Sequence, residues 1–252
     1  MERKNKLIIG IFSLTGCEGC CFAILDMKQE FVALGNKVEI KNFRLFEEDI
    51  HLENEKYDVA FIEGSPLTQE NREQVKLIRR NSEMVVALGA CSCMGGIYHI
   101  KQYQDKTKIF QHVYHNDIGI ENFDVQTLEQ LITVDHKIPG CPINSQEFMR
   151  FVYGLIVGKK IESVQNPVCY ECQMRGYECL LQKGQVCLGP ITFGGCEAIC
   201  LKSRQGCWGC RGLVKDAEVS NLIKKLREKY TDKEITKYLE VFGIKEQINN
   251  LS

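Results

Sequence analysis

This sequence of 252 residues has a net charge close to zero, no long apolar run and few histidines. The formal net charge is −1, so there is no broad basic field to attract nucleic acid or an acidic membrane surface. No stretch approaches the roughly 20 consecutive apolar residues that a membrane-spanning helix needs. These absences argue against a nucleic-acid-binding protein and against an integral membrane protein.

Targeting and nucleotide-binding signals are missing as well. The first residues, Met1 to Lys6, have neither the apolar core of a secretion signal nor a twin-arginine leader. The fingerprint Gly-x-Gly-x-x-Gly does not follow the first apolar stretch, which argues against a nicotinamide cofactor on this chain. We therefore expect a cytoplasmic protein that binds no dinucleotide of its own.

Cysteine, in contrast, is abundant: the chain has 14 cysteines and only five histidines. Disulfides are disfavoured in the reducing cytosol, so this many thiols in a cytoplasmic chain indicates metal binding. Thiolates are soft ligands, and a cysteine-rich set with few histidines suits iron–sulfur clusters or structural zinc. The positions of these cysteines therefore carry most of the functional information.

The first part of the chain alternates strand-like and helix-like stretches. Continuous or alternating apolar runs predict strands at 7–13, 37–43, 57–62, 84–88 and 133–138. Helical spacing predicts helices at 21–34, 68–80 and 144–157. This order indicates an α/β fold, with a parallel sheet that is covered by helices on both faces.

The pattern changes near residue 158. Residues 167–212 show little periodicity but contain eight cysteines, so metal ligation would have to replace a hydrophobic core there. The tail is again helical, and its residues 231–234 resemble a capping box. We therefore predict an α/β domain at 1–158, a cluster domain at 159–213 and a helical extension at 214–252.

Notable residues follow the predicted strands, in the loops where the strands end. The pair Cys17 and Cys20 follows the first strand, Glu63-Gly-Ser follows the third, and Cys91 and Cys141 follow the next two. Carboxyl ends of parallel strands meet at one edge of a sheet, so these loops should converge. Neighbouring glycines would let the backbone approach a bulky cluster and offer N–H groups to its sulfides.

Four of the six cysteines before residue 150 are predicted to bind the first cluster: Cys17, Cys20, Cys91 and Cys141. Cys21 and Cys93 lie one or two residues from better-placed cysteines and are interpreted as buried, inert thiols. Glu63 has two open interpretations: a carboxylate that bonds a helix end or loop, or one that acts at a subunit interface or in proton movement. Glu18 is interpreted as a solvated loop residue.

These four loops together resemble the N-terminal domain of nickel–iron hydrogenase small subunits. The family pattern is Cys-x-x-Cys, Glu-Gly-Ser, Gly-x-Cys-x-x-x-Gly-Gly and Pro-Gly-Cys-Pro, and this chain matches it at 17–20, 63–65, 89–96 and 139–142. The resemblance implies a flavodoxin-like domain that holds the proximal [4Fe–4S] cluster. In the family this cluster is the one nearest the nickel–iron centre of the large subunit.

The resemblance continues through the second cysteine-rich part. The segments 187–190, 195–196 and 207–212 resemble the family's second domain, and Cys169-x-x-Cys172 replaces the His-x-x-Cys of uptake enzymes. That replacement is typical of the cytoplasmic branch, the archaeal sulfhydrogenase delta subunits and the small (gamma) subunits of methanogen viologen-reducing hydrogenases. The helical tail is most similar to the sulfhydrogenase version.

By resemblance, the eight later cysteines form two further [4Fe–4S] clusters. The distal set is Cys169, Cys172, Cys179 and Cys187, and the medial set is Cys196, Cys200, Cys207 and Cys210. Spacing alone would also permit an interleaved pairing. Trp208 and Tyr170 lie beside these ligands and are interpreted as packing that shields the clusters, rather than as electron relays.

The resemblance implies an electron-transfer small subunit that is not active alone. Its expected partners are a nickel–iron large subunit and a flavin- or NAD(P)-binding or ferredoxin-like acceptor subunit. Two alternatives remain open. One is an electron-transfer module for a different catalytic partner, because the related cluster subunit of respiratory complex I also has adjacent cysteines, as at Cys20-Cys21. The other is a scaffold that binds structural zinc.

Overall fold

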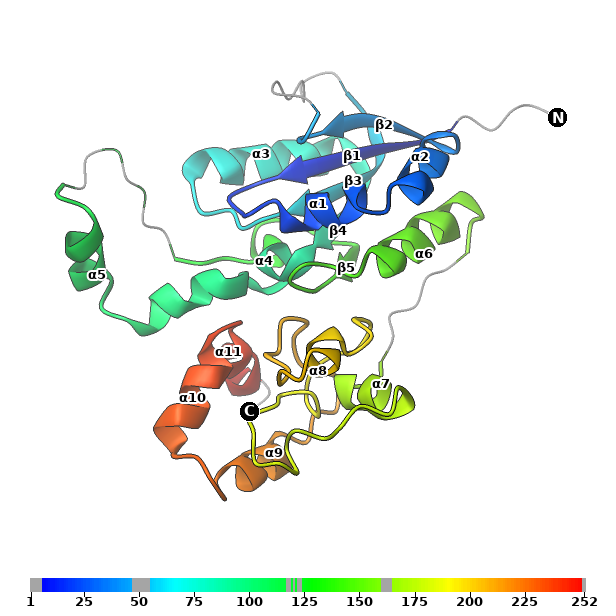
Figure 1. Ribbon diagram of the computed structural model, residues 1–252. Coiled ribbons are helices and arrows are strands. Elements are labelled where there is room, and N and C mark those ends of the chain that lie inside the picture. The colour runs from blue at the N-terminus through cyan, green and yellow to red at the C-terminus, as the bar shows by residue number, and fades with distance from the viewer. Residues whose placement is uncertain are drawn as a thin grey trace. The chain divides into compact units, whose positions relative to one another are not determined.

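The computed structural model describes residues 6–46, 55–116, 119, 121, 124–159 and 165–250. Contacts divide the chain into two compact units (Figure 1). The first contains Met1–Gly95 and Asp117–Ile161, and the second contains Gly96–Asn116 and Glu162–Ser252. The segment 96–116 therefore groups with the second unit, although it lies within the predicted first domain in the sequence.

The first unit is built on a parallel sheet of five strands in the order β2-β1-β3-β4-β5. The strands are β1 (Leu7–Ser13), β2 (Val38–Phe43), β3 (Tyr57–Glu63), β4 (Ser82–Leu88) and β5 (His136–Ile138). The predicted α/β class is confirmed, and each predicted strand is present. The strand order reverses between β1 and β3, so the carboxyl ends of these two strands lie at a topological switch point, where open sheets bind their ligands.

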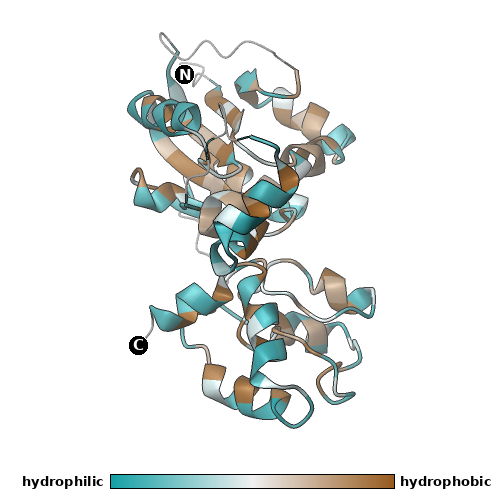
Figure 2. Cartoon of the chain, turned by 90° about the vertical axis from the view of Figure 1, so that its left-hand side faces the viewer, coloured by the Kyte–Doolittle hydropathy of each residue, from teal (hydrophilic) through white to brown (hydrophobic). Residues whose placement is uncertain are grey.

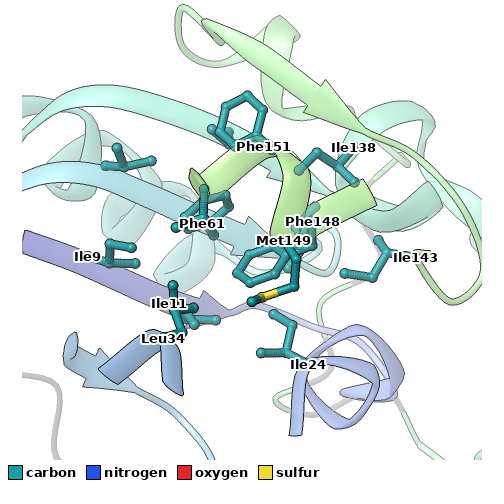
Figure 3. Close-up of a cluster of buried hydrophobic side chains, with 14 of the residues drawn as sticks. Ile9, Ile11, Ile24, Leu34, Phe61, Ile138, Ile143, Phe148, Met149 and Phe151 are labelled. Atoms are coloured by element: carbon teal, nitrogen blue, oxygen red, sulfur yellow. The ribbon is translucent and has the colours of Figure 1, made fainter. Parts of the chain in front are cut away.

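Helices cover both faces of this sheet. One face carries α1 (Gly19–Leu25), α2 (Gln29–Gly35) and α6 (Ser145–Ile156), and the other carries α3 (Gln69–Arg80) and α4 (Gly89–Met94). Ile9 and Ile11 of β1 point into the first core, where Phe61 and Phe148 meet them (Figure 3). Phe12, the next residue of β1, points to the opposite core, as the two-residue period of a strand requires.

The predicted helix at 21–34 is wrong in one respect, because the structure breaks it into α1 and α2. Lys28 interrupts the helix with a φ of +48°. A straight helix would turn Ile24 and Leu34 toward different directions, because ten residues are not a whole number of turns. The break allows both side chains to enter the same buried cluster, and their burial offsets the strained backbone at Lys28.

The second unit is assembled from short helices and irregular loops. Its helices are the 3₁₀ helix η1 (Gly96–Tyr103), α5 (Lys106–Val113), α7 (Val168–Met174), α8 (Ile199–Lys202), α9 (Val219–Leu226), α10 (Asp232–Glu240) and α11 (Ile244–Asn249). A second 3₁₀ helix, η2 (Leu128–Gln130), belongs to the first unit. The predicted capping box is confirmed: Glu234 N–H donates to Thr231 Oγ1 at 3.4 Å, and Thr231 N–H donates to Glu234 Oε2 at 2.8 Å.

The segment 96–116 is held by the C-terminal helices of the second unit. The His99 side chain is buried against Gly243, and Lys245 Nζ lies 5.0 Å from the centre of the Tyr103 ring.

Hydrophobic residues run along the strands, and hydrophilic residues lie on the outer faces of helices (Figure 2). Among the helices of the described residues, none has the length and apolar character that crossing a bilayer requires.

Candidate iron–sulfur cluster sites

The loops predicted to form the first site lie at one edge of the sheet and are bonded to one another. They leave the carboxyl ends of β1, β3, β4 and β5. Ser65 N–H, after β3, donates to Thr15 O, after β1, at 2.8 Å. Ala90 N–H, after β4, donates to Gly140 O, after β5, at 2.7 Å. These bonds hold the loops in place through the backbone, so the site does not depend on one flexible side chain.

The four thiols predicted as ligands of the first cluster lie within electrostatic reach of one another. Cys20 interacts with Cys91 and Cys141, and Cys91 interacts with Cys141 and Cys17. A Cβ atom at Gly89, where φ is +86°, would lie only 2.5 Å from Cys20 Sγ. Glycine is therefore required at position 89, because no larger residue leaves room for the thiol.

Burial disfavours the charged form of these thiols. Burial raises the pKa of Cys91 to about 12, and the charges of Cys141, Cys17 and Glu63 act in the same direction. Burial also raises the pKa of Cys20, with Glu63 again contributing. A set of neighbouring thiols is the donor chemistry that iron–sulfur clusters use, and iron would take the place of these protons. The residues present therefore fit such a cluster.

Cys21 and Cys93 are buried, as predicted, and they belong to the two hydrophobic cores of the first unit. Cys21 is 0% exposed and Cys93 is 7% exposed. The Cys93 thiol donates a hydrogen bond to Ala87 O at 3.4 Å, which turns it back toward β4. That both thiols are inert stays a prediction.

Glu63 is a buried carboxylate that bonds the first turn of α1. It accepts a hydrogen bond from Cys21 N–H at 2.9 Å and one from Ser13 Oγ at 3.3 Å. Burial raises its pKa, and the bond from Cys21 N–H lowers it in part. The structure thus confirms the first interpretation of Glu63, a carboxylate that bonds a helix end. Its role in proton movement or at a subunit interface stays a prediction. Glu18 lies in the loop, 3.9 Å from Arg44 Nε.

In the second unit, the four cysteines of the predicted distal set line one small cavity: Cys169, Cys172, Cys179 and Cys187. Helix α7 supplies the first two, and Gly189 lets the chain pass close to the thiols. A Cβ atom there would lie 3.4 Å from Cys187 Sγ and 3.8 Å from Cys169 Sγ. Burial raises the pKa of Cys169 to about 12, and the other three thiols add to that shift. These thiols also fit a cluster.

Two interactions join cysteines of the predicted medial set. Cys196 interacts with Cys200, and Cys207 interacts with Cys210. Cys207 N–H also donates to Cys187 Sγ of the distal set at 3.3 Å, so the two sets are neighbours. The joining of the two pairs into one cluster stays a prediction.

Sequence reasoning missed two charged residues beside the medial set. Glu171 lies between two predicted ligands of α7, and Arg211 directly follows Cys210. Glu171 bonds the loop that carries Cys196, and the buried Arg211 side chain bonds the same loop. Their position inside cysteine motifs was the one available signal.

The aromatic residues beside the ligands lie partly at the surface. Trp208 is 39% exposed and its ring centroid lies 5.0 Å from that of Tyr238, while Tyr170 is 50% exposed. Their shielding role stays a prediction.

Within the parts of the chain that the structure describes, no three Cys, His, Asp or Glu side chains converge closely enough to hold a single metal ion.

Comparison with known proteins gives similarities over most of the chain. The family model of the NADH ubiquinone oxidoreductase 20 kDa subunit matches residues 17–155. Sulfhydrogenase 2 subunit delta of Pyrococcus furiosus is 32% identical and aligns over 93% of this chain and 98% of its own length. A subunit of the F420-non-reducing hydrogenase of Methanothermobacter thermautotrophicus is 27% identical, over 82% of this chain and 79% of its own length.

Solved structures show the same architecture. The actinobacterial-type NiFe-hydrogenase of Ralstonia eutropha H16 aligns over 97% of this chain and 91% of the matching chain, with a TM-score of 0.62 and 14% identity. An NAD⁺-reducing [NiFe]-hydrogenase in the H2-reduced state aligns over 63% of this chain and 95% of the matching chain, with a TM-score of 0.55 and 25% identity. The first likeness is one of fold alone.

Proposed function

This chain belongs to the NADH ubiquinone oxidoreductase 20 kDa subunit family and is a relative of the sulfhydrogenase 2 delta subunit, and on that basis we propose that it is the electron-transfer small subunit of a nickel–iron hydrogenase. The observation that carries the proposal is the gathering of cysteines from separate loops at the sheet edge beside the β1–β3 switch point. Thiols from 17–20, 91 and 141 interact there although they are far apart in the sequence.

The chain would hold three [4Fe–4S] clusters. Its proximal ligands are Cys17, Cys20, Cys91 and Cys141; its distal ligands are Cys169, Cys172, Cys179 and Cys187; and its medial ligands are Cys196, Cys200, Cys207 and Cys210. When bound, such clusters supply one-electron transfer in series. The residues of the chain fix the ligands in space, exclude water by burial and set the local charge. Gly89 makes room for Cys20, and Glu63 fixes the first turn of the helix that carries it.

The partners follow from this role. A large subunit with a nickel–iron site would exchange electrons with the proximal end, and a flavin- or NAD(P)-binding or ferredoxin-like subunit would accept them at the other end. The complex would operate in the cytoplasm. The chain itself would carry no nickel and would not be active alone.

Iron and acid-labile sulfide analysis of anaerobically purified chain tests the clusters directly. Three four-iron clusters require about twelve iron atoms per chain, with equal sulfide. Zinc without sulfide would support the scaffold alternative and would contradict the proposal.

The variant Cys141→Ser tests the proximal site in the complex with its large subunit. We expect the loss of about four iron atoms, and we expect hydrogen no longer to reduce the remaining clusters. The matched control is Cys93→Ser, a thiol of the same edge that is 7% exposed and bonds Ala87 O. It should keep its iron. If hydrogen reduced the Cys141→Ser complex at the parent rate, the assignment of Cys141 would be wrong.

A second candidate function is electron transfer for a different catalytic partner. It is favoured by the adjacent Cys20-Cys21 pair and by the family model, which is named for a subunit of NADH ubiquinone oxidoreductase. Hydrogen uptake by the complex purified with its native partner separates the two functions. A complex that contains the clusters but neither consumes nor produces hydrogen would favour the second.

A further inference from the structure

The loop that carries Cys196 lies between two opposite charges, each supplied by a different cysteine motif. Glu171 lies inside the Cys169-x-x-Cys172 motif, and Arg211 directly follows Cys210, the last cysteine of the Cys207-x-x-Cys210 motif. Neither residue is among the twelve predicted ligands, and neither belongs to the hydrophobic cores of the second unit. Their position suggests a role that acts on the Cys196 site through space.

Glu171 approaches the loop with both carboxylate oxygens. Oε1 accepts a hydrogen bond from Gly195 N–H at 2.6 Å, and Oε2 accepts one from Ala198 N–H at 3.2 Å. Oε2 also lies 3.9 Å from Cys196 Sγ. A Cβ atom at Gly194 would lie only 3.3 Å from Oε1, so glycine at this position leaves space for the carboxylate. A negative charge is thus fixed beside the sulfur of a predicted ligand.

Arg211 approaches the same loop as a buried cation. The residue is 3% exposed, and its Nε–H donates to Gly194 O at 2.6 Å. Its guanidinium carbon lies 5.7 Å from the centre of the Phe193 ring. Arg211 therefore places a positive charge against the backbone two residues before Cys196, and Glu171 places a negative charge against the next residue, Gly195. Because the site is partly shielded from water, these charges act more strongly than surface charges would.

We propose that Glu171 and Arg211 set the reduction potential of the iron–sulfur cluster bound by Cys196, with Glu171 lowering it and Arg211 raising it. This inference rests on the proposed function, since it needs a cluster at Cys196. Reduction adds one negative charge to a cluster. A neighbouring carboxylate disfavours that charge and a neighbouring guanidinium favours it. Glu171 is a positioning residue as well, since its two hydrogen bonds fix the Cys196 loop.

The structure offers a matched control for the charge. Glu197 is next to Cys196, and its Oε2 bonds Arg175, the C-cap residue of α7, at 2.6 Å, so this pair joins the end of the same helix to the same loop. Its side chain is 46% exposed and is paired with a cation. Water and Arg175 therefore screen its charge from the cluster. Removing a charge at 197 perturbs the same connection without removing a fixed charge from the sulfur.

The experiment is a potentiometric titration of the purified complex, followed by electron paramagnetic resonance of each cluster. Glu171→Gln keeps the shape of the side chain and should move the midpoint of one cluster to a more positive value, with iron and sulfide content unchanged. Arg211→Gln should move the same midpoint to a more negative value. Glu197→Gln should move it by much less than either variant.

Several results would overturn the inference. They are unchanged midpoints in Glu171→Gln, an equal shift in Glu197→Gln, a shift of Glu171→Gln and Arg211→Gln in the same direction, or loss of iron from Glu171→Gln. The last two would show that these side chains act on structure rather than on charge. Absence of iron–sulfur signals from the parent complex would instead contradict the proposed function, so the two failures are distinguishable.

Discussion

The two units of this protein position cysteines in different ways. In the first unit, the loops that carry the predicted ligands follow the strands of a sheet. The hydrophobic cores on the two faces of this sheet contain residues such as Ile9, Ile11, Phe12 and Phe61. In the second unit, some of the predicted ligands are themselves part of a hydrophobic core. Three of the seven members of one buried cluster are Cys172, Cys187 and Cys207.

This difference separates two sources of stability. Apolar burial can hold the first unit together whether or not metal is bound, since its five-stranded sheet is covered by helices. The cysteine-rich part of the second unit has short helices, and thiols take up much of its interior. Its buried thiols pack as small apolar groups, and metal ligation would add to their contribution to stability.

Removing the metal should give the largest contrast between the units. After chelation of iron under reducing conditions, we expect the region from 165 to 212 to lose its structure, while the parallel sheet persists. Hydrogen exchange followed by mass spectrometry measures both in one sample. The amides of β1, β3 and β4 should stay protected, and those of α7 and α8 should exchange rapidly. Equal loss of protection in β3 and α7 would contradict this separation.

A smaller contrast compares two glycines of the first unit that both have positive φ. Gly89→Ala places a methyl group 2.5 Å from Cys20 Sγ, whereas Gly158, with φ of +67°, has nothing within 4 Å of its Cβ position. In both variants, alanine at a positive φ destabilises the folded state by about 1–2 kcal/mol through backbone strain. Gly89→Ala should in addition lose about four iron atoms per chain.

Iron analysis and urea unfolding measure the two effects separately. Gly158→Ala serves as the control for backbone strain and should keep its iron. If Gly89→Ala retained the parent iron content, the close approach between position 89 and Cys20 would not matter for ligand geometry.

The smallest effect is a pH dependence of the first unit that does not involve the predicted ligands. Burial lowers the pKa of His136 in β5, whose ring stacks on Phe151 at 4.5 Å. The pKa of histidine in an unfolded chain is about 6.5. Between the lowered native pKa and that value, the unfolded chain binds more protons than the folded chain. Stability therefore increases as the pH rises through this window and is lost as the pH falls.

His136→Phe keeps the aromatic contact and should remove this pH dependence. Urea unfolding between about pH 5 and pH 8 measures it, with the span chosen around the unfolded value. The same substitution at His112, which is exposed on α5, should leave the pH dependence of the parent in place. Parallel curves for the parent and His136→Phe would rule out a contribution from this histidine.

The sequence predicted those features that depend on local pattern. Apolar runs located the five strands. Because the carboxyl ends of parallel strands lie at one edge of a sheet, the sequence also predicted that Cys17, Cys91 and Cys141 lie close together. The capping box at Thr231 was also readable, since its partners are three residues apart. Burial of Cys21 and Cys93 followed from their position next to better-placed thiols.

Features that depend on distant contacts were out of reach. The break between helices α1 and α2, before Gln29, exists because Leu34 must enter a core formed by other elements. No residue type between 26 and 28 predicts this break. The role of Glu171 depends on a loop 24–27 residues further along the chain. Composition could not reveal either feature, because each residue type is ordinary in its local context.

The assignment of residues 96–116 to the second unit has a consequence for dissecting the protein. The chain passes from the first unit to the second after Gly95, returns at Asp117 and leaves again after Ile161. No single cut can separate the units: a fragment ending at residue 158 would carry His99 and Tyr103 without Gly243 and Lys245, the residues that hold them. During synthesis, too, this inserted segment must wait for the last helices to emerge from the ribosome before it can dock.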